Sequence, residues 1–285
     1  MKNNKVLLAG ATGYLGRHIA LELEKKRYPL KIIKRNGSEV PFDTKNMEVI
    51  EAEVTNPESL KGELDGTDVV ISTVGITRQN DGFTYMDVDY QANSNLLQEA
   101  NKAGVKKFVY VSAFNADRIK HLKMAAAKEK FVDELKYSGM DYCIIRPNGF
   151  FSDMTEFLKM AKKGKAELFG DGNYKMNPIH GEDLAEICVN AIESNDNTIE
   201  IGGPEVFTHN EIVKLAANII GKEVKISYMP EWVRRMILWS ARTFTSTKKY
   251  GPMEFFFTVL AMDMVAPAYG KHTLSDYFNE MKTKI

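Results

Sequence analysis

Short apolar runs alternate with longer segments of helical spacing through the first half of the chain. Each run is bounded by turn residues, and some are apolar without interruption, as in Val69, Val70 and Ile71, which is typical of a strand covered on both faces. The runs lie at residues 6–9, 30–33, 48–52, 69–73, 108–112 and 142–146. Strands that alternate with helices in this way predict an α/β fold with a doubly wound parallel sheet of the Rossmann type.

The pattern changes after residues 146–149. Loops, short strands and helices follow, with turn signals at residues 170–173 and 202–204. We therefore expect a Rossmann-type domain over residues 1–148 and a smaller α/β cap over residues 149–285, packed closely on the first domain.

Three glycines follow the first apolar run at a spacing that suits phosphate binding. Gly10, Gly13 and Gly16 are separated by two residues each, and a helical segment begins at Tyr14. Glycines let the backbone approach a phosphate closely, and the first amides of the helix attract a pyrophosphate. We expect a dinucleotide to contact this loop through Gly10, Thr12, Gly13, Tyr14, Leu15 and Gly16. A tight turn without a ligand is the alternative.

The residues after the second run bear on the choice of nucleotide. An acidic side chain there bonds a ribose hydroxyl, whereas a basic one accommodates a 2′-phosphate. This chain has Lys34 and Arg35 and no carboxylate, which favours NADP(H) over NAD(H), with Arg35 as the planar clamp. A solvated basic turn is the alternative. The residues that follow later strands are further candidates for cofactor contacts. Glu53 and Val54 follow the third strand and are expected beside the adenine. Ser72, Thr73, Val74 and Gly75, at the end of the fourth strand, are expected beside the nicotinamide ribose.

Composition narrows the ligand class. The 285 residues hold 38 basic and 38 acidic side chains, so no overall field recruits nucleic acid, and a small molecule is the expected ligand. Cys143 and Cys188 lack the spacing of a metal site or a redox couple, and we expect packing roles in a reducing compartment and no bound metal. The first residues run directly into a strand with no apolar leader, which favours the cytoplasm.

Several motifs together resemble a known family. The chain is similar to the atypical short-chain dehydrogenases/reductases of the NAD(P)-binding, NmrA-like branch over most of residues 5–225. The matching segments are GATGYLG at 10–16, STVG at 72–75, AGVKKFVYVS at 103–112, IRPNGFF at 145–151, NPIHGEDLA at 177–185 and IGGPE at 201–205. The resemblance implies the cofactor more firmly than the reaction, because the branch holds reductases, nucleotide sensors and assembly subunits.

The resemblance also implies catalytic positions. Typical members pair a serine with Tyr-x-x-x-Lys, and here Ser112 and Lys128 match the serine and the lysine while Met124 occupies the tyrosine position. Methionine donates no proton. Lys128 is then expected to bind the cofactor or, with a pKa lowered by burial, to act as an acid or base itself. A solvated helical lysine is the alternative.

The resemblance further implies which residues surround the reacting groups. Pro147, Asn148 and Phe150 are expected beside the cofactor. The substrate pocket is expected to include Phe114, Asn148, Phe151 and Tyr174. Substitute proton donors near the cleft are Tyr110, His121, Tyr174 and His180, although His180 is expected to cap the helix that follows it.

Two functions remain open from the sequence. The leading hypothesis is an NADPH-dependent oxidoreductase that transfers hydride to a small apolar carbonyl, enone or quinone-type substrate. The alternative is a non-catalytic NADP(H)-binding redox sensor or assembly factor. The basic, tryptophan-bearing segment 231–250 is compatible with the alternative, because it suits a peripheral membrane or protein contact, although a cap helix that packs its apolar face on the core is the preferred explanation. A nucleotide-sugar epimerase is disfavoured, since such enzymes normally keep the tyrosine.

Overall fold

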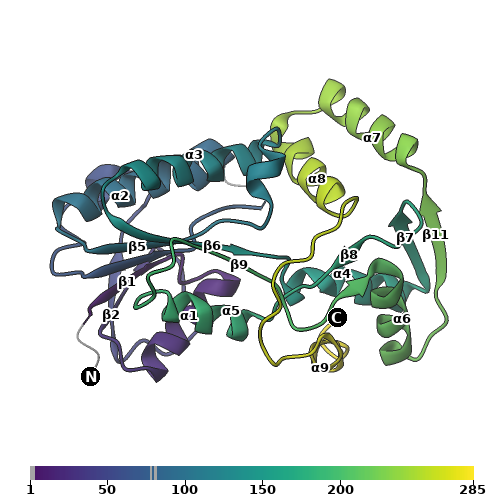
Figure 1. Ribbon diagram of the computed structural model, residues 1–285, viewed down its shortest axis with the longest axis horizontal. Coiled ribbons are helices and arrows are strands. Elements are labelled where there is room, and N and C mark those ends of the chain that lie inside the picture. The colour runs from purple at the N-terminus through teal and green to yellow at the C-terminus, as the bar shows by residue number, and fades with distance from the viewer. Residues whose placement is uncertain (1–3, 78, 80–81) are drawn as a thin grey trace. The chain divides into compact units, whose positions relative to one another are not determined.

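The structure is a computed structural model that describes residues 4–77, 79 and 82–285 (Figure 1). The chain divides into two compact units. The first unit comprises Met1–Arg146 and Leu184–Ile199, and the second comprises Pro147–Asp183 and Glu200–Ile285. The sequence predicted a single boundary after residue 148, whereas the chain returns to the first unit at Leu184–Ile199. This returning segment leads into β9, which extends the sheet of the first unit.

A seven-stranded sheet forms the centre of the first unit, in the order β3-β2-β1-β4-β5-β6-β9. Strand β1 is central, with Val6 opposite Leu30 on one side and Val69 on the other, both in parallel register. The strands are β1 (Val6–Ala9), β2 (Leu30–Lys34), β3 (Met47–Glu51), β4 (Val69–Ser72), β5 (Lys107–Val111), β6 (Asp141–Pro147) and β9 (Thr198–Ile201). Along the sheet from β3 through β2, β1, β4 and β5 to β6, each strand pairs in parallel with its neighbour. This arrangement confirms the expected Rossmann-type α/β fold.

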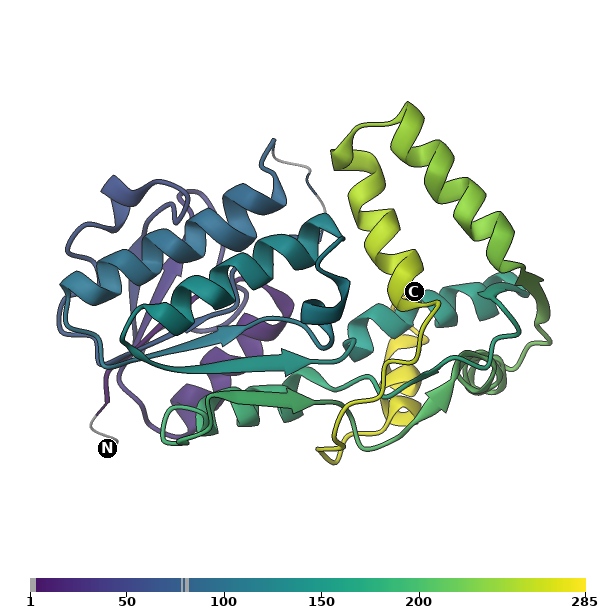
Figure 2. The same ribbon diagram turned by 45° about the horizontal axis from the view of Figure 1, so that its top comes forward.

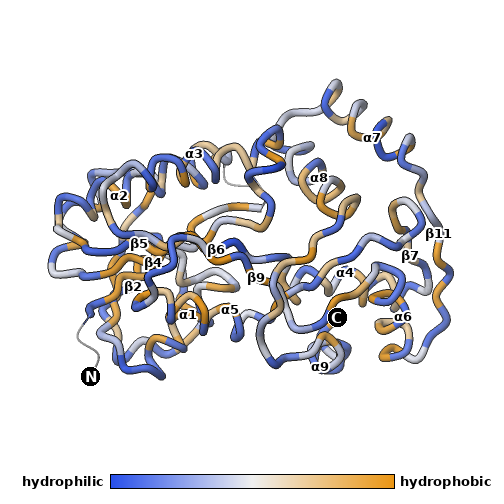
Figure 3. The backbone as a smooth tube through the Cα atoms, in the orientation of Figure 1, coloured by the Kyte–Doolittle hydropathy of each residue, from blue (hydrophilic) through white to orange (hydrophobic). Residues whose placement is uncertain are grey.

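Helices cover both faces of this sheet, as Figures 1 and 2 show. Helices α2 (Asn93–Lys102) and α3 (Lys123–Tyr137) lie on one face, and α1 (Tyr14–Lys25) and α5 (Gly181–Asn190) lie on the other. A π-helix (Met86–Ala92) leads into α2, and two short 3-10 helices span Pro57–Leu60 and Ala116–Ile119. Double coverage explains why the strands are so apolar (Figure 3).

The apolar runs located six of the strands to within one or two residues at either end. Strand β9 was not expected, because its four residues Thr198–Ile201 alternate polar and apolar side chains and give no apolar run. It is nevertheless held in place, since the Ile144 amide donates to the Asn197 carbonyl oxygen at 2.9 Å. Cys143 and Cys188 are both buried, which agrees with the packing role expected for them.

The second unit is built mainly of helices. They are α4 (Phe151–Lys163), α6 (His209–Ile220), α7 (Glu231–Phe244), α8 (Thr247–Val259) and α9 (Leu274–Met281). Two small sheets accompany them: β7 (Lys165–Phe169) pairs in parallel with β11 (Lys225–Met229), and β8 (Lys175–Met176) pairs antiparallel with β10 (Phe207–Thr208). In the described part of the chain, each helix is too short or too polar to cross a membrane.

A buried ion pair crosses the interior of the first unit from α3 to β6. The guanidinium of Arg146 binds the Glu129 carboxylate at two points, with N···O distances of 2.7 and 2.8 Å. Both side chains are almost completely buried. A charge in such a position depends on its partner, because removal of one member leaves the other unpaired in the interior.

We expect Arg146→Met to lower the free energy of unfolding by about 3–5 kcal/mol, because the Glu129 carboxylate loses its cation. Urea unfolding followed by circular dichroism measures this loss. Lys120→Met is the control, since Lys120 faces Asp133 in an exposed pair at 3.8 Å, and should cost less than about 1 kcal/mol. The double variant Glu129→Gln/Arg146→Met should recover part of the loss. Equal effects of Arg146→Met and Lys120→Met would contradict this interpretation.

Candidate nucleotide-binding groove

The turn from β1 into α1 is closed by direct backbone contacts. Gly10 has a φ of +89°, and a Cβ atom there would lie 2.4 Å from the Thr73 hydroxyl oxygen. A Cβ on Gly16 would lie 2.0 Å from the Gly10 carbonyl oxygen. Neither position therefore accepts a side chain without displacement of the backbone.

The start of α1 is left open to an anion. Gly13 caps the helix without any side-chain hydrogen bond, and the first turn holds no acidic residue. The first amides of a helix lack partners within it and carry the positive end of the helix dipole. The turn thus provides the backbone arrangement that binds a phosphate.

A groove begins at this turn and crosses the carboxyl ends of the strands. It encloses about 890 Å³, part of it open to solvent, and it lies entirely in the first unit. Nine residues expected at the cofactor line it, namely Gly10, Thr12, Gly13, Arg35, Glu53, Val54, Thr73, Val74 and Gly75. Lys34, the basic neighbour of Arg35 in the sequence, also lines the groove. Six further lining residues were not singled out for the site by sequence reasoning, namely Ile33, Ala52, Thr55, Ile76, Phe83 and Val88.

Five expected cofactor residues of the first unit do not line this groove, namely Tyr14, Leu15, Gly16, Ser72 and Lys128. The Leu15 side chain and Gly16 are buried, and Tyr14 packs edge-on against His18 at 5.2 Å. Ser72 is fully buried, and its hydroxyl donates to the Asn93 side-chain oxygen at 2.6 Å. The expected role of Ser72 at the nicotinamide ribose is therefore corrected, because its hydroxyl faces the interior and supports the strand end instead.

A buried lysine stands behind the β4 end of the groove. The Lys128 ammonium lies 3.0 Å from the Asp89 carboxylate, and a Cβ on Gly75 would lie 3.0 Å from the same ammonium and 2.6 Å from the carboxylate. The ammonium also lies 5.6 Å from the centre of the Tyr110 ring. Asp89 was not foreseen, since an acidic residue within a polar helical segment carries no sequence signal of burial.

The charges of this cluster reverse one expectation. Burial alone would lower the pKa of Lys128, but Tyr110 and Asp89 favour the ammonium more strongly, so that the pKa of Lys128 is raised. Burial also raises the pKa of Asp89, and it raises the pKa of Tyr110 to about 12. The pKa of Lys128 is thus raised rather than lowered by its surroundings, which favours the ammonium form, a hydrogen-bond donor and a cation.

The expected catalytic serine belongs to the buried ion pair. The Ser112 hydroxyl donates to Glu129 at 3.2 Å, and Glu129 is in turn held by Arg146. Ser112 is not among the residues that line the groove. Met124 is buried on α3, one turn before Lys128.

Most of the expected substrate residues lie in the second unit, while Phe114 is buried in the first. The Asn148 side chain donates to the side chain of Asn177 and to the backbone of Met264. Phe151 is buried, with its ring centre 5.6 Å from those of His180 and Tyr277. These contacts give Asn148 and Phe151 packing roles within the second unit.

Pro147, Phe150 and Tyr174 also belong to the second unit. Pro147 ends β6, Phe150 precedes α4, and the Tyr174 ring packs over Gly170. Their expected contacts with the cofactor or the substrate stay predictions. His121, one of the substitute proton donors, is exposed just before α3.

Comparison with known proteins shows the family of the chain. The model of a family described as NAD(P)H-binding matches residues 10–195, which include the glycine turn, the ends of the strands and Lys128. The chain belongs to this NAD(P)H-binding family.

Relatives in the family have different functions. A photosystem II assembly factor of Trieres chinensis is 25% identical over 81% of this chain and 74% of its own length. A chloroplastic divinyl chlorophyllide a 8-vinyl-reductase of Zea mays is 27% identical over 97% of this chain and 79% of its own length. Among solved structures, an NADPH-dependent quinone oxidoreductase of Escherichia coli in complex with NADPH superposes with a TM-score of 0.71, at 18% identity, over 97% of this chain and 99% of that one. The structural likeness shows a shared fold.

Proposed function

We propose that the protein is an NADPH-dependent reductase that transfers hydride to a small apolar carbonyl, enone or quinone-type compound. The observation that carries the proposal is the Lys128 ammonium, which Asp89 holds beside Gly75 at the β4 end of the groove. Family membership supplies the coenzyme, the relative from Zea mays is named as a reductase, and the structure from Escherichia coli is named as an NADPH-dependent quinone oxidoreductase.

The order of the strands gives the groove a direction. The β2 end carries Arg35, the central β1 end carries the glycine turn, and the β4 end carries Gly75. We assign the adenosine half of the coenzyme to the β2 end, the pyrophosphate to the glycine turn and the nicotinamide half to the β4 end. This direction brings the reacting half to Lys128.

Lys128 then acts through its charge. The bound coenzyme supplies the hydride, and the protein supplies binding, orientation and electrostatics. An ammonium with a raised pKa is a persistent donor to a ribose hydroxyl or to an acceptor oxygen that gains negative charge. Because Met124 donates no proton, acceptors whose reduced form takes its proton from water, such as quinones and enones, suit this site best.

The preference for NADPH rests on the loop after β2. Lys34 is bound to Glu51 at 2.6 Å, so its charge is largely neutralised. Arg35 is exposed and also lines a second hollow, with Asn36, Gly37 and Ser38, that adjoins the groove. A guanidinium in this place matches the geometry of a phosphate at two points.

We expect Arg35→Ala to weaken NADPH binding about 30-fold, which corresponds to the loss of one charge-assisted contact of about 2 kcal/mol. Binding of NADH should change less than threefold, because NADH lacks the 2′-phosphate. Isothermal titration of both coenzymes measures the two changes. Lys45→Ala, which removes an exposed charge elsewhere in the same unit, is the control and should change neither affinity. Equal weakening of both coenzymes would exclude Arg35 as the selective residue.

Activity tests the reductase itself. The protein should oxidise NADPH in the presence of a member of a panel of quinones, enones and aldehydes, as followed by the absorbance of the reduced nicotinamide. Lys128→Met/Asp89→Asn, which removes both buried charges together, should lower turnover about 100-fold while the protein stays folded. Lys136→Met is the control, because Lys136 is exposed on the same helix.

Two results would contradict the proposal. The first is the absence of NADPH oxidation with every acceptor by protein that binds NADPH. The second is unchanged turnover in the folded double variant, which would remove Lys128 from the reaction.

A second candidate function is favoured by the surface of α7 and α8. Trp232, Trp239 and Phe244 are 66%, 62% and 77% exposed, and Trp232 and Trp239 lie two helical turns apart on one side of α7. Arg242, Lys248 and Lys249 are exposed nearby in the sequence. We propose as the alternative a non-catalytic NADP(H)-binding assembly factor that uses these aromatic and basic side chains to rest on an anionic membrane surface. One relative is named as an assembly factor.

Flotation with liposomes tests this alternative. The protein should float with vesicles that contain anionic lipid, and Trp232→Ser/Trp239→Ser should lower the bound fraction at least fivefold, since tryptophan anchors at the lipid interface. Tyr137→Ser is the control, because Tyr137 is 90% exposed in the first unit. High salt should release part of the bound protein. Flotation that both variants retain equally would argue against this surface.

A further inference from the structure

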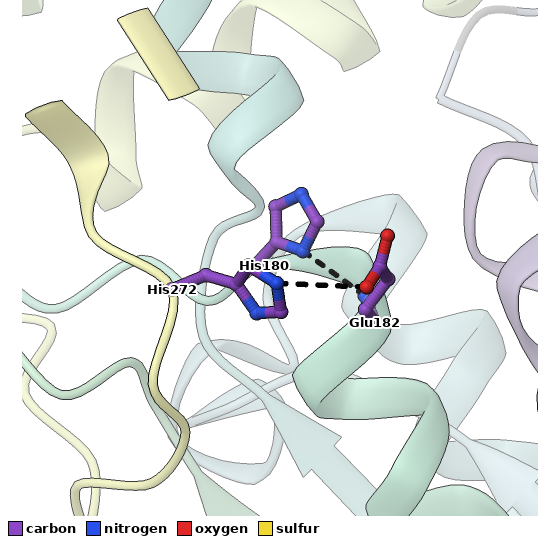
Figure 4. A group of neighbouring side chains, drawn as sticks. All are labelled: His180, Glu182 and His272. Carbon is purple, nitrogen blue, oxygen red and sulfur yellow. Dashed lines mark hydrogen bonds and ion pairs between the residues drawn. The ribbon is translucent and has the colours of Figure 1, made fainter. Parts of the chain in front are cut away.

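Two histidines and a glutamate converge at the start of α5, within the second unit (Figure 4). His180 directly precedes the helix, Glu182 lies in its first turn, and His272 comes from the segment that leads into α9. One nitrogen or oxygen atom of each side chain lies within 4.8 Å of the other two. The His272 Nε2 atom is 3.5 Å from the Glu182 carboxylate.

A buried carboxylate fixes the His272 ring. Asp183 accepts hydrogen bonds from the backbone amides of Lys271 and His272, both at 3.1 Å, and its other oxygen lies 2.8 Å from His272 Nδ1. Gly270 has a φ of +101°, and a Cβ there would lie 2.2 Å from Asp183. The backbone at residues 270–272 is therefore pinned against the start of α5.

The hydrogen bond between His272 Nδ1 and Asp183 determines whether Nε2, on the other side of the ring, is a donor or an acceptor. When Nδ1 donates its proton to Asp183, a neutral His272 turns the lone pair of Nε2 toward the Glu182 carboxylate. Two acceptors that face each other at 3.5 Å repel unless a cation lies between them. That cation is either a proton on Nε2 or a metal ion.

His180 provides a third nitrogen beside this gap. Its Nδ1 atom accepts a hydrogen bond from the Glu182 backbone amide at 3.3 Å, on the side of the ring that faces Glu182 in Figure 4, as expected of a residue that caps the helix. A metal ion bound there would replace this long hydrogen bond. The two imidazole rings are 4.3 Å apart and inclined by only 30°. A third ligand atom thus borders the gap between His272 and Glu182. The carboxylates of Glu182 and Asp183 also offset the positive end of the helix.

We propose that His180, Glu182 and His272 bind a divalent transition-metal ion of the zinc type, with Asp183 as the carboxylate that orients His272. Two imidazoles and one carboxylate are a donor set that zinc uses, with a fourth position open to water. Bonds of about 2.1 Å in a tetrahedral site separate ligand atoms by roughly 3.4 Å, close to the spacing of His272 and Glu182. A histidine that donates its second ring proton to a carboxylate is typical of such sites.

The bound ion would join two segments of the second unit. Residues 270–272 and the start of α5 come from segments far apart in the sequence, and an ion held by both would stabilise the second unit by binding only its folded form. This role does not depend on the groove or on the proposed reductase activity.

Isothermal titration of chelator-treated protein with Zn²⁺ tests the proposal, with Mg²⁺ as the comparison. We expect one Zn²⁺ per chain, no Mg²⁺ binding in the same range, and a melting temperature that rises with Zn²⁺ concentration. Glu182→Gln and His272→Gln should each weaken Zn²⁺ binding at least tenfold. Glu182 is 61% exposed, so its variant is expected to fold. His121→Gln, which removes an exposed histidine in the first unit, should bind as the unchanged protein does.

Either of two results would overturn the metal site. One is the absence of Zn²⁺ binding to the unchanged chain, in which case a proton on His272 is the bridging cation. The other is Zn²⁺ binding that the Glu182→Gln and His272→Gln variants retain at full strength.

Discussion

The contact between Gly10, Gly16 and the end of β4 is the constraint on which the nucleotide groove depends. The Gly10 carbonyl accepts from the Gly13 amide at 3.0 Å, and the Thr73 hydroxyl lies against the same turn. A side chain at Gly16 would occupy space that the Gly10 backbone already fills, and a side chain at Gly10 would meet the Thr73 hydroxyl and require a positive φ. The first turn of α1 therefore opens next to the carboxyl end of the central strand, and every other lining residue follows from the order of the sheet.

Local charge, rather than net charge, prepares the groove for a polyanionic coenzyme. The chain as a whole is neutral, so it has no long-range attraction for anions. The helix amides and Arg35 supply positive potential where phosphates would lie, while Glu51 offsets Lys34 nearby. In the proposed function, a single guanidinium distinguishes two coenzymes that differ by one phosphate.

The sequence predicted the parts of the fold that depend on local pattern. Six strands, the glycine turn and the helix after it follow from apolar runs and glycine spacing, which reflect burial on both faces and close backbone approach. The sequence did not predict the direction in which side chains point at the ends of the strands. Ser72 and Ser112 follow or end strands as expected, yet both hydroxyls turn to buried partners, Asn93 and Glu129.

Local sequence patterns could not predict contacts between segments that are distant in the sequence. Asp89 meets Lys128 because a π-helix and α3 pack together, and His272 meets Asp183 through a segment that no motif marks. The return of Leu184–Ile199 to the first unit is of the same kind. Such pairs become visible only when the topology places their elements side by side.

The buried ion pairs Arg146–Glu129 and Lys128–Asp89 of the first unit differ in their position relative to the groove, and therefore in the roles that they suit. Arg146 and Glu129 bind each other at two points away from the groove, which suits a role in folding alone. Lys128 and Asp89 share a single contact, and the absence of a side chain at Gly75 brings that pair up to the groove. Because a buried ion pair adds little net stability compared with apolar packing, its position beside a glycine argues for a chemical role. With methionine at position 124, the role we propose for the pair is a fixed positive charge rather than proton donation.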